Sequence, residues 1–265
     1  MPMAAPASYW NAAYRSRLAP PLIPHRDDVD NVRKALARCA GLHMLLGVTP
    51  EYGELTENMV AVDRRAGVIS DLWVPSFPGR DAVRATWLQL PFRGQSFTAI
   101  VGDGCLNTLD GPMLYERMFG QLVRILKPGG RLALRTFVTP AQAENCELVC
   151  AQAMAAKIGS FHAFKWRFAM AMAARQGGAR VHVADIRARF NDLIPDRDEL
   201  AIAAGWTSAA IETIDIYRDS QIQISFPTLD DVRLSFSPYF REVDLMYGSY
   251  ELAERCPILV LEAGR

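Results

Sequence analysis

The chain has 265 residues, half of them apolar, and its 29 lysines and arginines balance its 29 aspartates and glutamates. This length is enough for one large α/β domain with a full core, and the apolar fraction excludes a disordered chain. A net charge of zero gives no electrostatic reason to expect a nucleic-acid partner. The expected partner is therefore a small, roughly neutral substrate.

The N-terminal sequence has neither the basic region nor the apolar stretch of a signal peptide, and no run reaches the roughly 18 apolar residues of a membrane span. We therefore expect a cytoplasmic protein without membrane contact. The five cysteines lie at scattered positions, without a disulfide framework or a metal-ligand spacing. Free thiols and no metal site are expected.

Near the N-terminus, residues 8–26 combine aromatic side chains with a run of prolines, so this segment needs another part of the protein to pack against. An amphipathic helix is predicted at residues 27–38, where apolar residues recur at helical spacing.

The stretch from His43 to Asp63 predicts a strand, a tight turn, a helix and a second strand. Gly47 permits the turn, and Thr49 and Pro50 suit the N-cap and the first position of the helix. Asp63 follows Gly47 by 16 residues, close to the roughly 20 expected between a glycine turn and a ribose-binding acid. Ligands of open α/β sheets bind beyond the carboxyl ends of the strands. Nucleotide binding is therefore expected here, although the GxGxxG pattern is absent.

Strands and helices continue to alternate up to residue 138. The expected elements are a helix through Leu72, strands at 83–87 and 98–101, a helix from Pro112 to about 127, and a strand at 131–138. This order is typical of a parallel sheet with right-handed crossovers.

Beyond residue 140 the sequence becomes rich in alanine, methionine and aromatic residues at helical spacing. A helix at 196–204 and strands at 210–217 and 256–262 are predicted after it, with a short helix and loop between the two strands. We expect a single domain with an N-terminal cap (1–40), a cofactor-binding core (41–138), a helical lid (139–195) and closing strands (196–265).

Taken together, these residues resemble a class I S-adenosylmethionine-dependent methyltransferase of the small-molecule type. The resemblance is carried by the glycine turn, by Asp63, by LQLPFRGQSFTAIVGDG at 88–104 and by LKPGGRLAL at 126–134. It implies an α/β, Rossmann-like sheet of seven strands, mostly parallel with an antiparallel last strand, with helices on both faces and a helical lid insertion. It also implies S-adenosylmethionine as the cofactor.

The resemblance assigns roles to individual residues. Gly47 would let the backbone approach the methionine part of the cofactor, and Asp63, with Arg64 beside it, would bind the ribose hydroxyls. Thr86 falls at the position after the third strand where the family commonly has an acid that accepts the adenine amino group, and Trp87 next to it is available for stacking. Asp103 and Gly104 would lie near the methionine end and the transferred methyl group. The family's usual acid and its two further glycines are replaced by Leu45, Thr49 and Glu51, and Glu51 is a candidate for the missing carboxylate.

Methyl transfer requires positioning more than a fixed catalytic residue. Candidate catalytic residues are His162 as a general base, Asn107 as a hydrogen-bond partner of the substrate, and Tyr9 in an aromatic N-terminal cover; packing or surface roles remain open for all three. Lys165, Arg167 and Arg175 are interpreted as a solvated helix face.

The predicted function is methyl transfer to an oxygen, nitrogen or sulfur atom of a small molecule. The alternatives are an aminopropyltransferase and a non-catalytic binding protein with the same fold, and a nicotinamide-dependent oxidoreductase is a weaker one. Formation of a homodimer remains an open alternative at this point.

Overall fold

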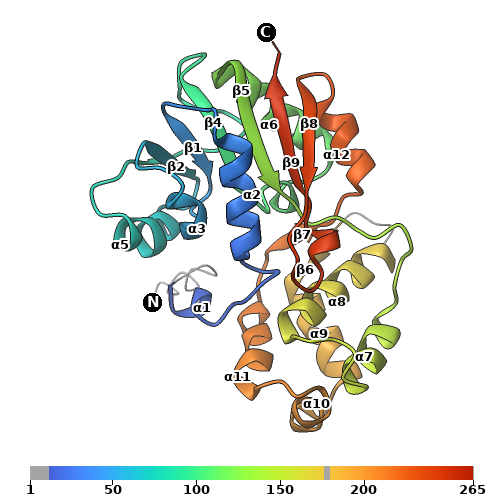
Figure 1. The fold of residues 1–265 in the computed structure, drawn as a ribbon. Helices are drawn as coiled ribbons and strands as arrows, with labels where there is room; N and C mark the ends of the chain where they lie inside the picture. Colours follow the sequence, from blue (N-terminus) through green and yellow to red (C-terminus); the bar gives the residue numbers. More distant parts are fainter. Residues whose placement is uncertain (1–11, 176–179, 265) are drawn as a thin grey trace.

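The computed structural model describes residues 12–175 and 180–264. A twisted sheet with helices on both faces forms one part of the molecule, and a lobe of helices lies beyond one end of the sheet (Figure 1). Tyr9 and Trp10 lie outside the described residues.

The sheet has seven strands in the order β3-β2-β1-β4-β5-β9-β8. They are β1 (His43–Leu46), β2 (Met59–Asp63), β3 (Ala82–Arg84), β4 (Phe97–Asp103), β5 (Leu126–Arg135), β8 (Phe240–Met246) and β9 (Ile258–Ala263). The first five strands are parallel, and β9 runs antiparallel to both of its neighbours, β5 and β8. The predicted fold class is confirmed.

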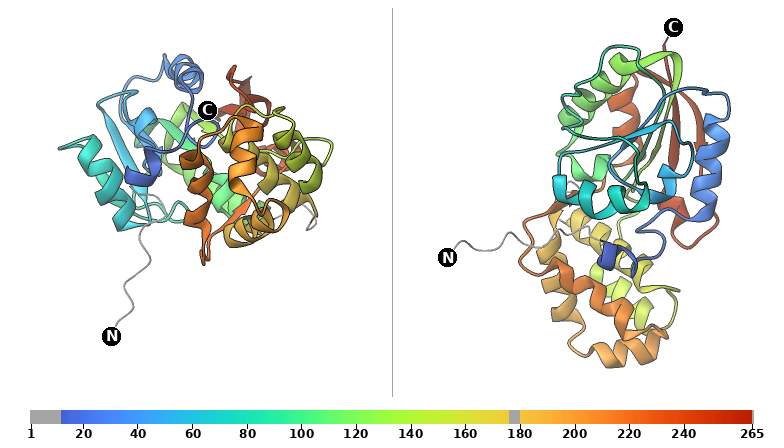
Figure 2. Two further views of the ribbon diagram at one scale, coloured as in Figure 1. Left: turned by 90° about the horizontal axis from the view of Figure 1, so that it is seen from below. Right: turned by 90° about the vertical axis from the view of Figure 1, so that its left-hand side faces the viewer.

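Two layers of helices cover the sheet. On one face lie α2 (Arg26–Leu36), α3 (Pro50–Gly53), and the helical segment formed by α4 (Ala66–Val68), the π-helical turn Ile69–Trp73 and α5 (Val74–Ser76). On the other face lie α6 (Pro112–Ile125) and α12 (Leu229–Phe236). The right-hand view of Figure 2 shows α2 and α6 on opposite sides of the sheet. Strand β1 contacts both layers because successive side chains alternate, so that Met44 and Leu46 face α6 while Leu45 faces α2.

The helical lobe lies beyond the carboxyl ends of the parallel strands (Figures 1 and 2). It contains α7 (Cys146–Met154), α8 (Phe161–Arg175), α9 (Val183–Leu193), α10 (Arg197–Ala204), α11 (Ser208–Ile211), the 3₁₀ helix Glu212–Tyr217, and a hairpin of β6 (Arg180–His182) and β7 (Gln223–Ser225). Its central helix, α8, has 12 buried residues among 15. A helix that is buried on nearly all sides needs apolar residues all round, which accounts for the dense aromatic and methionine content of this segment.

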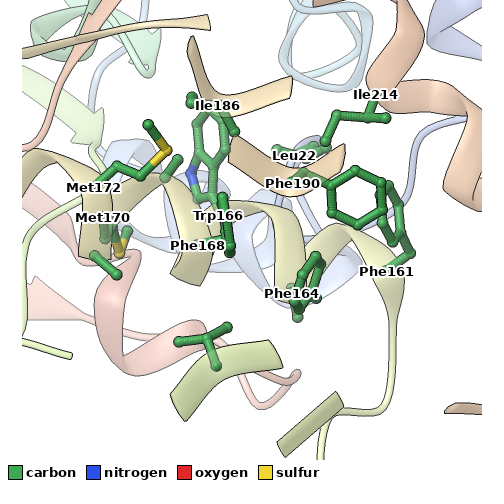
Figure 3. Close-up of a cluster of buried hydrophobic side chains, with 14 of the residues drawn as sticks. Leu22, Phe161, Phe164, Trp166, Phe168, Met170, Met172, Ile186, Phe190 and Ile214 are labelled. Carbon is green, nitrogen blue, oxygen red and sulfur yellow. The ribbon is translucent and has the colours of Figure 1, made fainter. Parts of the chain in front are cut away.

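The aromatic side chains of α8 form the core of this lobe. Figure 3 shows Phe161, Phe164, Trp166 and Phe168 packed against side chains of neighbouring elements such as Phe190. Each of these five residues is buried. They are core residues in this structure.

The strand predicted at 210–217 is wrong. This segment forms α11 and the 3₁₀ helix, so the helical elements continue past residue 195. Its buried residues, Ile211, Ile214 and Tyr217, recur every third position. That spacing matches the three residues per turn of a 3₁₀ helix and not the two-residue period of a strand.

The strand predicted at 83–87 is displaced, because β3 ends at Arg84 and leaves Thr86 and Trp87 in the turn that follows. Within the described ranges, no helix combines the length and the apolar character needed to cross a membrane.

Candidate active site at the strand ends

Three residues meet at the carboxyl ends of β1 and β2. Gly47 has a φ of +86°, and its amide donates a 2.8 Å hydrogen bond to the carbonyl of Val62. A Cβ atom at Gly47 would lie 3.7 Å from the ring of Trp87 and 3.9 Å from Oδ2 of Asp63. Glycine at this position therefore avoids backbone strain and leaves space between the acid and the indole.

Asp63 ends β2 with its carboxylate half-buried. Its Oδ1 accepts a 2.8 Å hydrogen bond from the amide of Arg65. Burial raises the pKa of Asp63, and the backbone and charge of Arg65 offset this only in part. A carboxylate that is incompletely solvated is well suited to accept further hydrogen bonds, such as those from the hydroxyls of a ribose.

Trp87, more than Thr86, approaches the turn after β1. The indole Nε1 of Trp87 donates a 2.8 Å hydrogen bond to the carbonyl of Val62, which fixes the ring beside Gly47. Thr86 is exposed, and its hydroxyl accepts from the amide of Leu88. An aromatic surface is therefore available beside the turn after β1.

The helix after the glycine turn is shorter than predicted. Thr49 occupies the N-cap position without a side-chain capping bond, and Pro50 begins α3, which has only 4 residues. Glu51 pairs with Arg15 of the short helix α1 (Ala12–Arg15). The carboxylate proposed to replace the family's acid is thus bonded to the N-terminal segment, and this contact attaches α1 to the strand ends.

A buried ion network supports the end of β4. Arg135 is about 1 % exposed, and its Nη1 donates a 2.7 Å hydrogen bond to Oδ1 of Asp103. Its Nε lies 3.0 Å from Oδ2 of Asp28, and its Nη2 donates to the carbonyl of Pro21. Burial raises the pKa of Asp28, while the positive charge of Arg135 opposes that rise. One guanidinium therefore joins β4, β5, α2 and the segment before α2.

Next to this network, Tyr52 has a fully buried hydroxyl that finds no hydrogen-bond partner among residues 12–175 and 180–264. Burial raises the pKa of Tyr52, and the negative charge of Asp103 adds to the effect. Gly104 follows Asp103 with a φ of +60°, and a Cβ there would lie 3.2 Å from the ring of Phe137. The ring of Phe137 in turn contacts Trp166 of the lobe, at 5.0 Å between centroids. The lobe thus covers the end of β4 through the ring of Phe137.

These strand-end residues coincide with a recognised domain. Residues 46–134 match the family model described as a methyltransferase domain. The chain therefore contains a methyltransferase domain. The cofactor that the sequence resemblance implies is S-adenosylmethionine. The convergence of Gly47, Asp63 and Trp87 and the unpartnered hydroxyl of Tyr52 fit this group, because they offer an acceptor for ribose, an aromatic surface and a polar atom at the strand ends.

Solved structures share the fold of this protein at low sequence identity. N-methyltransferase NodS from Bradyrhizobium japonicum WM9, in complex with S-adenosyl-L-homocysteine, is 11% identical with a TM-score of 0.52 over 96% of this chain and 97% of that chain. A SAM-dependent methyltransferase from Methanosarcina mazei is 12% identical with a TM-score of 0.53 over 91% and 99%.

A protein from Rhodobacter sphaeroides named as a putative Zn-dependent alcohol dehydrogenase is 10% identical, with a TM-score of 0.56 over 92% and 91% of the two chains. At these identities the likeness concerns the fold alone. Among the residues that the structure describes, no group of three or more histidine, cysteine, aspartate or glutamate side chains could hold a metal ion. No curated protein matches the sequence.

The side chain of Asn107 has no hydrogen-bonding capacity to spare for a substrate. Its Nδ2 donates 2.7 Å bonds to the carbonyls of Phe137 and Ser225. Its Oδ1 accepts from the amide of Phe137 and the hydroxyl of Thr136. These four bonds attach the loop after β4 to the end of β5 and to β7. They favour a structural role for Asn107.

His162 is buried in the lobe. Its Nε2 lies 3.1 Å from the carbonyl of Arg17, and its Nδ1 has no hydrogen-bond partner in the described part of the chain. Burial and the nearby charge of Lys165 lower the pKa of His162 to about 4. The ring is therefore neutral at physiological pH and is fixed to the N-terminal segment, which favours packing over proton transfer.

Sequence reasoning missed three polar residues of this region: Arg135, Tyr52 and Lys165. The interpretation of Lys165 as part of a solvated face is wrong, because its side chain is completely buried. A basic residue inside the apolar strand segment RLALRTFV was the available signal for Arg135, since an isolated charge in a buried strand needs a charged partner.

Proposed function

We propose that this methyltransferase acts on a small-molecule acceptor that binds between the carboxyl ends of the strands and the helical lobe. The observation that carries the proposal is the meeting of Gly47, Asp63 and Trp87 beside the end of β1. In the strand order, β1 lies between β2 and β4. The end of β4, with Asp103 and Gly104, is therefore adjacent to this group.

Bound S-adenosylmethionine supplies an electrophilic methyl group on a sulfonium. In the proposed arrangement, Asp63 accepts hydrogen bonds from the ribose hydroxyls, and the turn at Gly47 brings the backbone close to the methionine part. The ring of Trp87 packs along the adenosine. Arg64 and Thr86, both exposed, flank the nucleoside.

The remaining assigned residues border the methionine end. Thr49 and Glu51 lie on the helix start beyond Gly47, and Asp103 and Gly104 lie beside the transferred methyl group. Methyl transfer is an in-line displacement, so the protein accelerates it mainly by orienting the acceptor and excluding water. The contact between Phe137 and Trp166 supplies an apolar cover at the end of β4.

The charges at the end of β4 favour methyl transfer over aminopropyl transfer. A polyamine acceptor is cationic and needs unneutralised carboxylates. Here the carboxylates of Asp103 and Asp28 both pair with Arg135, so neither acid is without a cationic partner and at most one net negative charge remains.

The test is the affinity for S-adenosylmethionine and S-adenosylhomocysteine, measured by calorimetry, in the wild type and in Asp63→Ala. A hydrogen bond to a charged group contributes about 1.5–3 kcal/mol, so Asp63→Ala should weaken binding by about 10- to 100-fold. Asp81→Ala is the matched control, since Asp81 is an exposed aspartate just before β3. Its affinity should equal that of the wild type.

Failure of the wild type to bind either compound would contradict the proposed function. Normal cofactor binding by Asp63→Ala would contradict only the assignment of Asp63 as the residue that binds the ribose. Transfer of the radiolabelled methyl group to candidate small molecules then identifies the acceptor.

A further inference from the structure

Lys165 is a buried lysine in the middle of α8. Its exposed fraction is 0%, and its ammonium lies among aromatic rings. The Nζ atom is 5.2 Å from the ring centroid of Tyr217, 5.8 Å from that of Phe161 and 5.9 Å from that of Tyr14. Three rings at such distances form a cage that favours a positive charge.

The hydrogen bonds around Lys165 also require its Nζ atom to act as a donor. Nζ lies 3.1 Å from Oγ1 of Thr213. The hydroxyl of Thr213 itself donates a 2.6 Å hydrogen bond to the carbonyl of Ala210. Thr213 can therefore only accept from Lys165. A second contact, of 3.4 Å, joins Nζ to the hydroxyl of Tyr14. These two contacts leave one N–H of the ammonium without an oxygen or nitrogen partner among the described residues.

The lysine also lacks a counter-charge. Within residues 12–175 and 180–264, no carboxylate forms an ion pair with Lys165, and the nearest charge that acts on it is that of Arg17, which is positive. Burial and Arg17 together lower the pKa of Lys165 to about 7. A buried ammonium is stable only when it is paired and hydrogen-bonded, so one negative charge would complete the environment of Lys165 among the described residues.

We propose that Lys165 binds the carboxylate of an aromatic or similarly apolar acid, which is the acceptor of the methyl group. This inference rests on the proposed function and specifies its substrate class. The ammonium provides the charge and the unpaired N–H, and the cage of Tyr14, Phe161 and Tyr217 provides the surface for the apolar part of the acid.

The position of Lys165 relative to the strand ends supports this assignment. Tyr14 contacts Lys165, while the next residue, Arg15, pairs with Glu51 beside the glycine turn. Helix α1 thus touches the lysine and the cofactor end of β1 at once. An acid reaches Nζ when its carboxylate replaces the hydroxyl of Tyr14 as the hydrogen-bond partner, while the ring of Tyr14 stays beside the acid.

The experiment uses the full chain saturated with S-adenosylhomocysteine and follows the binding of benzoate by calorimetry, with benzamide as the uncharged analogue. Benzoate should bind the wild type at least tenfold more tightly than benzamide. Lys165→Met should lose at least tenfold in benzoate affinity, whereas Lys165→Arg, which keeps the charge, should lose less than Lys165→Met. Lys157→Met is the matched control, since Lys157 is an exposed lysine of the same lobe.

The pH dependence gives an independent readout. The titratable or charged groups that face Lys165 are His162 on α8, Tyr14 and Arg17 of the N-terminal segment, and Tyr217 of the 3₁₀ helix. With the pKa of His162 at about 4 and that of Lys165 at about 7, it is Lys165 and not His162 that changes charge between pH 6 and 9. Benzoate affinity should therefore fall by at least tenfold between pH 6.5 and 9.

Three results would overturn the inference: no benzoate binding by the wild type, equal benzoate affinity in Lys165→Met, or an affinity that increases with pH. The last result would indicate that the neutral amine, and not the ammonium, is the form that binds benzoate. Binding of S-adenosylhomocysteine by Lys165→Met reports whether the variant is folded and whether the proposed function holds. Normal cofactor binding combined with any of the three results refutes the acid-binding role alone.

Discussion

Replacing Asn107 with alanine separates a structural role from a catalytic one. The side chain is 3% exposed and makes four hydrogen bonds, to Thr136, to Ser225 and to both backbone groups of Phe137. Each such bond contributes about 1 kcal/mol net. Asn107→Ala should therefore lower the free energy of unfolding by about 4 kcal/mol, a large share of the 5–15 kcal/mol of a typical protein.

Thermal unfolding measures this effect directly. For a chain of this size, 1 kcal/mol corresponds to about 2–4 °C in Tm, so Asn107→Ala should unfold about 8–16 °C below the wild type. The neighbouring Thr108→Ala is the control, because Thr108 is exposed and makes one hydrogen bond, to the carbonyl of Cys105. A Tm within 2 °C of the wild type, together with a lost turnover, would refute the structural role and restore Asn107 as a substrate-binding residue.

Two further predictions concern packing and protonation. Gly53→Ala should destabilise the protein by about 1–3 kcal/mol, because the added Cβ would overlap the ring of Phe77 and lie 3.0 Å from that of Trp73; Gly67→Ala, with no atom within 4 Å, should leave Tm unchanged or slightly raised. The pKa of His162 lies at about 4, below its usual value of 6.5, so the unfolded chain binds the additional proton and stability falls as the pH drops from 6.5 to 4. Denaturant titrations of His162→Gln should show a smaller loss over this range, and an identical loss would contradict the assignment.

The parallel core could be predicted from sequence because its signals are local. Apolar runs ending at Asp63 and at Asp103, a helix that begins at Pro112, and turns at glycines are each contained within one segment of the chain. Ligand sites of such sheets lie at the carboxyl ends of strands. The order of elements therefore predicts a ligand site at these strand ends.

The roles of the polar residues around that site could not be predicted in the same way. Asn107 suggested a substrate contact because it follows a strand end, yet one of its hydrogen bonds reaches Ser225, 118 residues further along the chain. Arg135 bonds to the carbonyl of Pro21, 114 residues before it. Such partners are set by how distant segments pack, and no local pattern specifies them.

The helical lobe shows the same difference between what local sequence patterns predict and what packing decides. Sequence periodicity alone determined that a helix rich in aromatic residues follows β5, but it assigned Lys165 to solvent because lysine is rarely buried. The tertiary structure decided otherwise, since α1, α8 and the 3₁₀ helix enclose that side chain together. The physical reason is that periodicity reports the environment of one helix at a time, whereas the burial of a charge depends on all the elements around it.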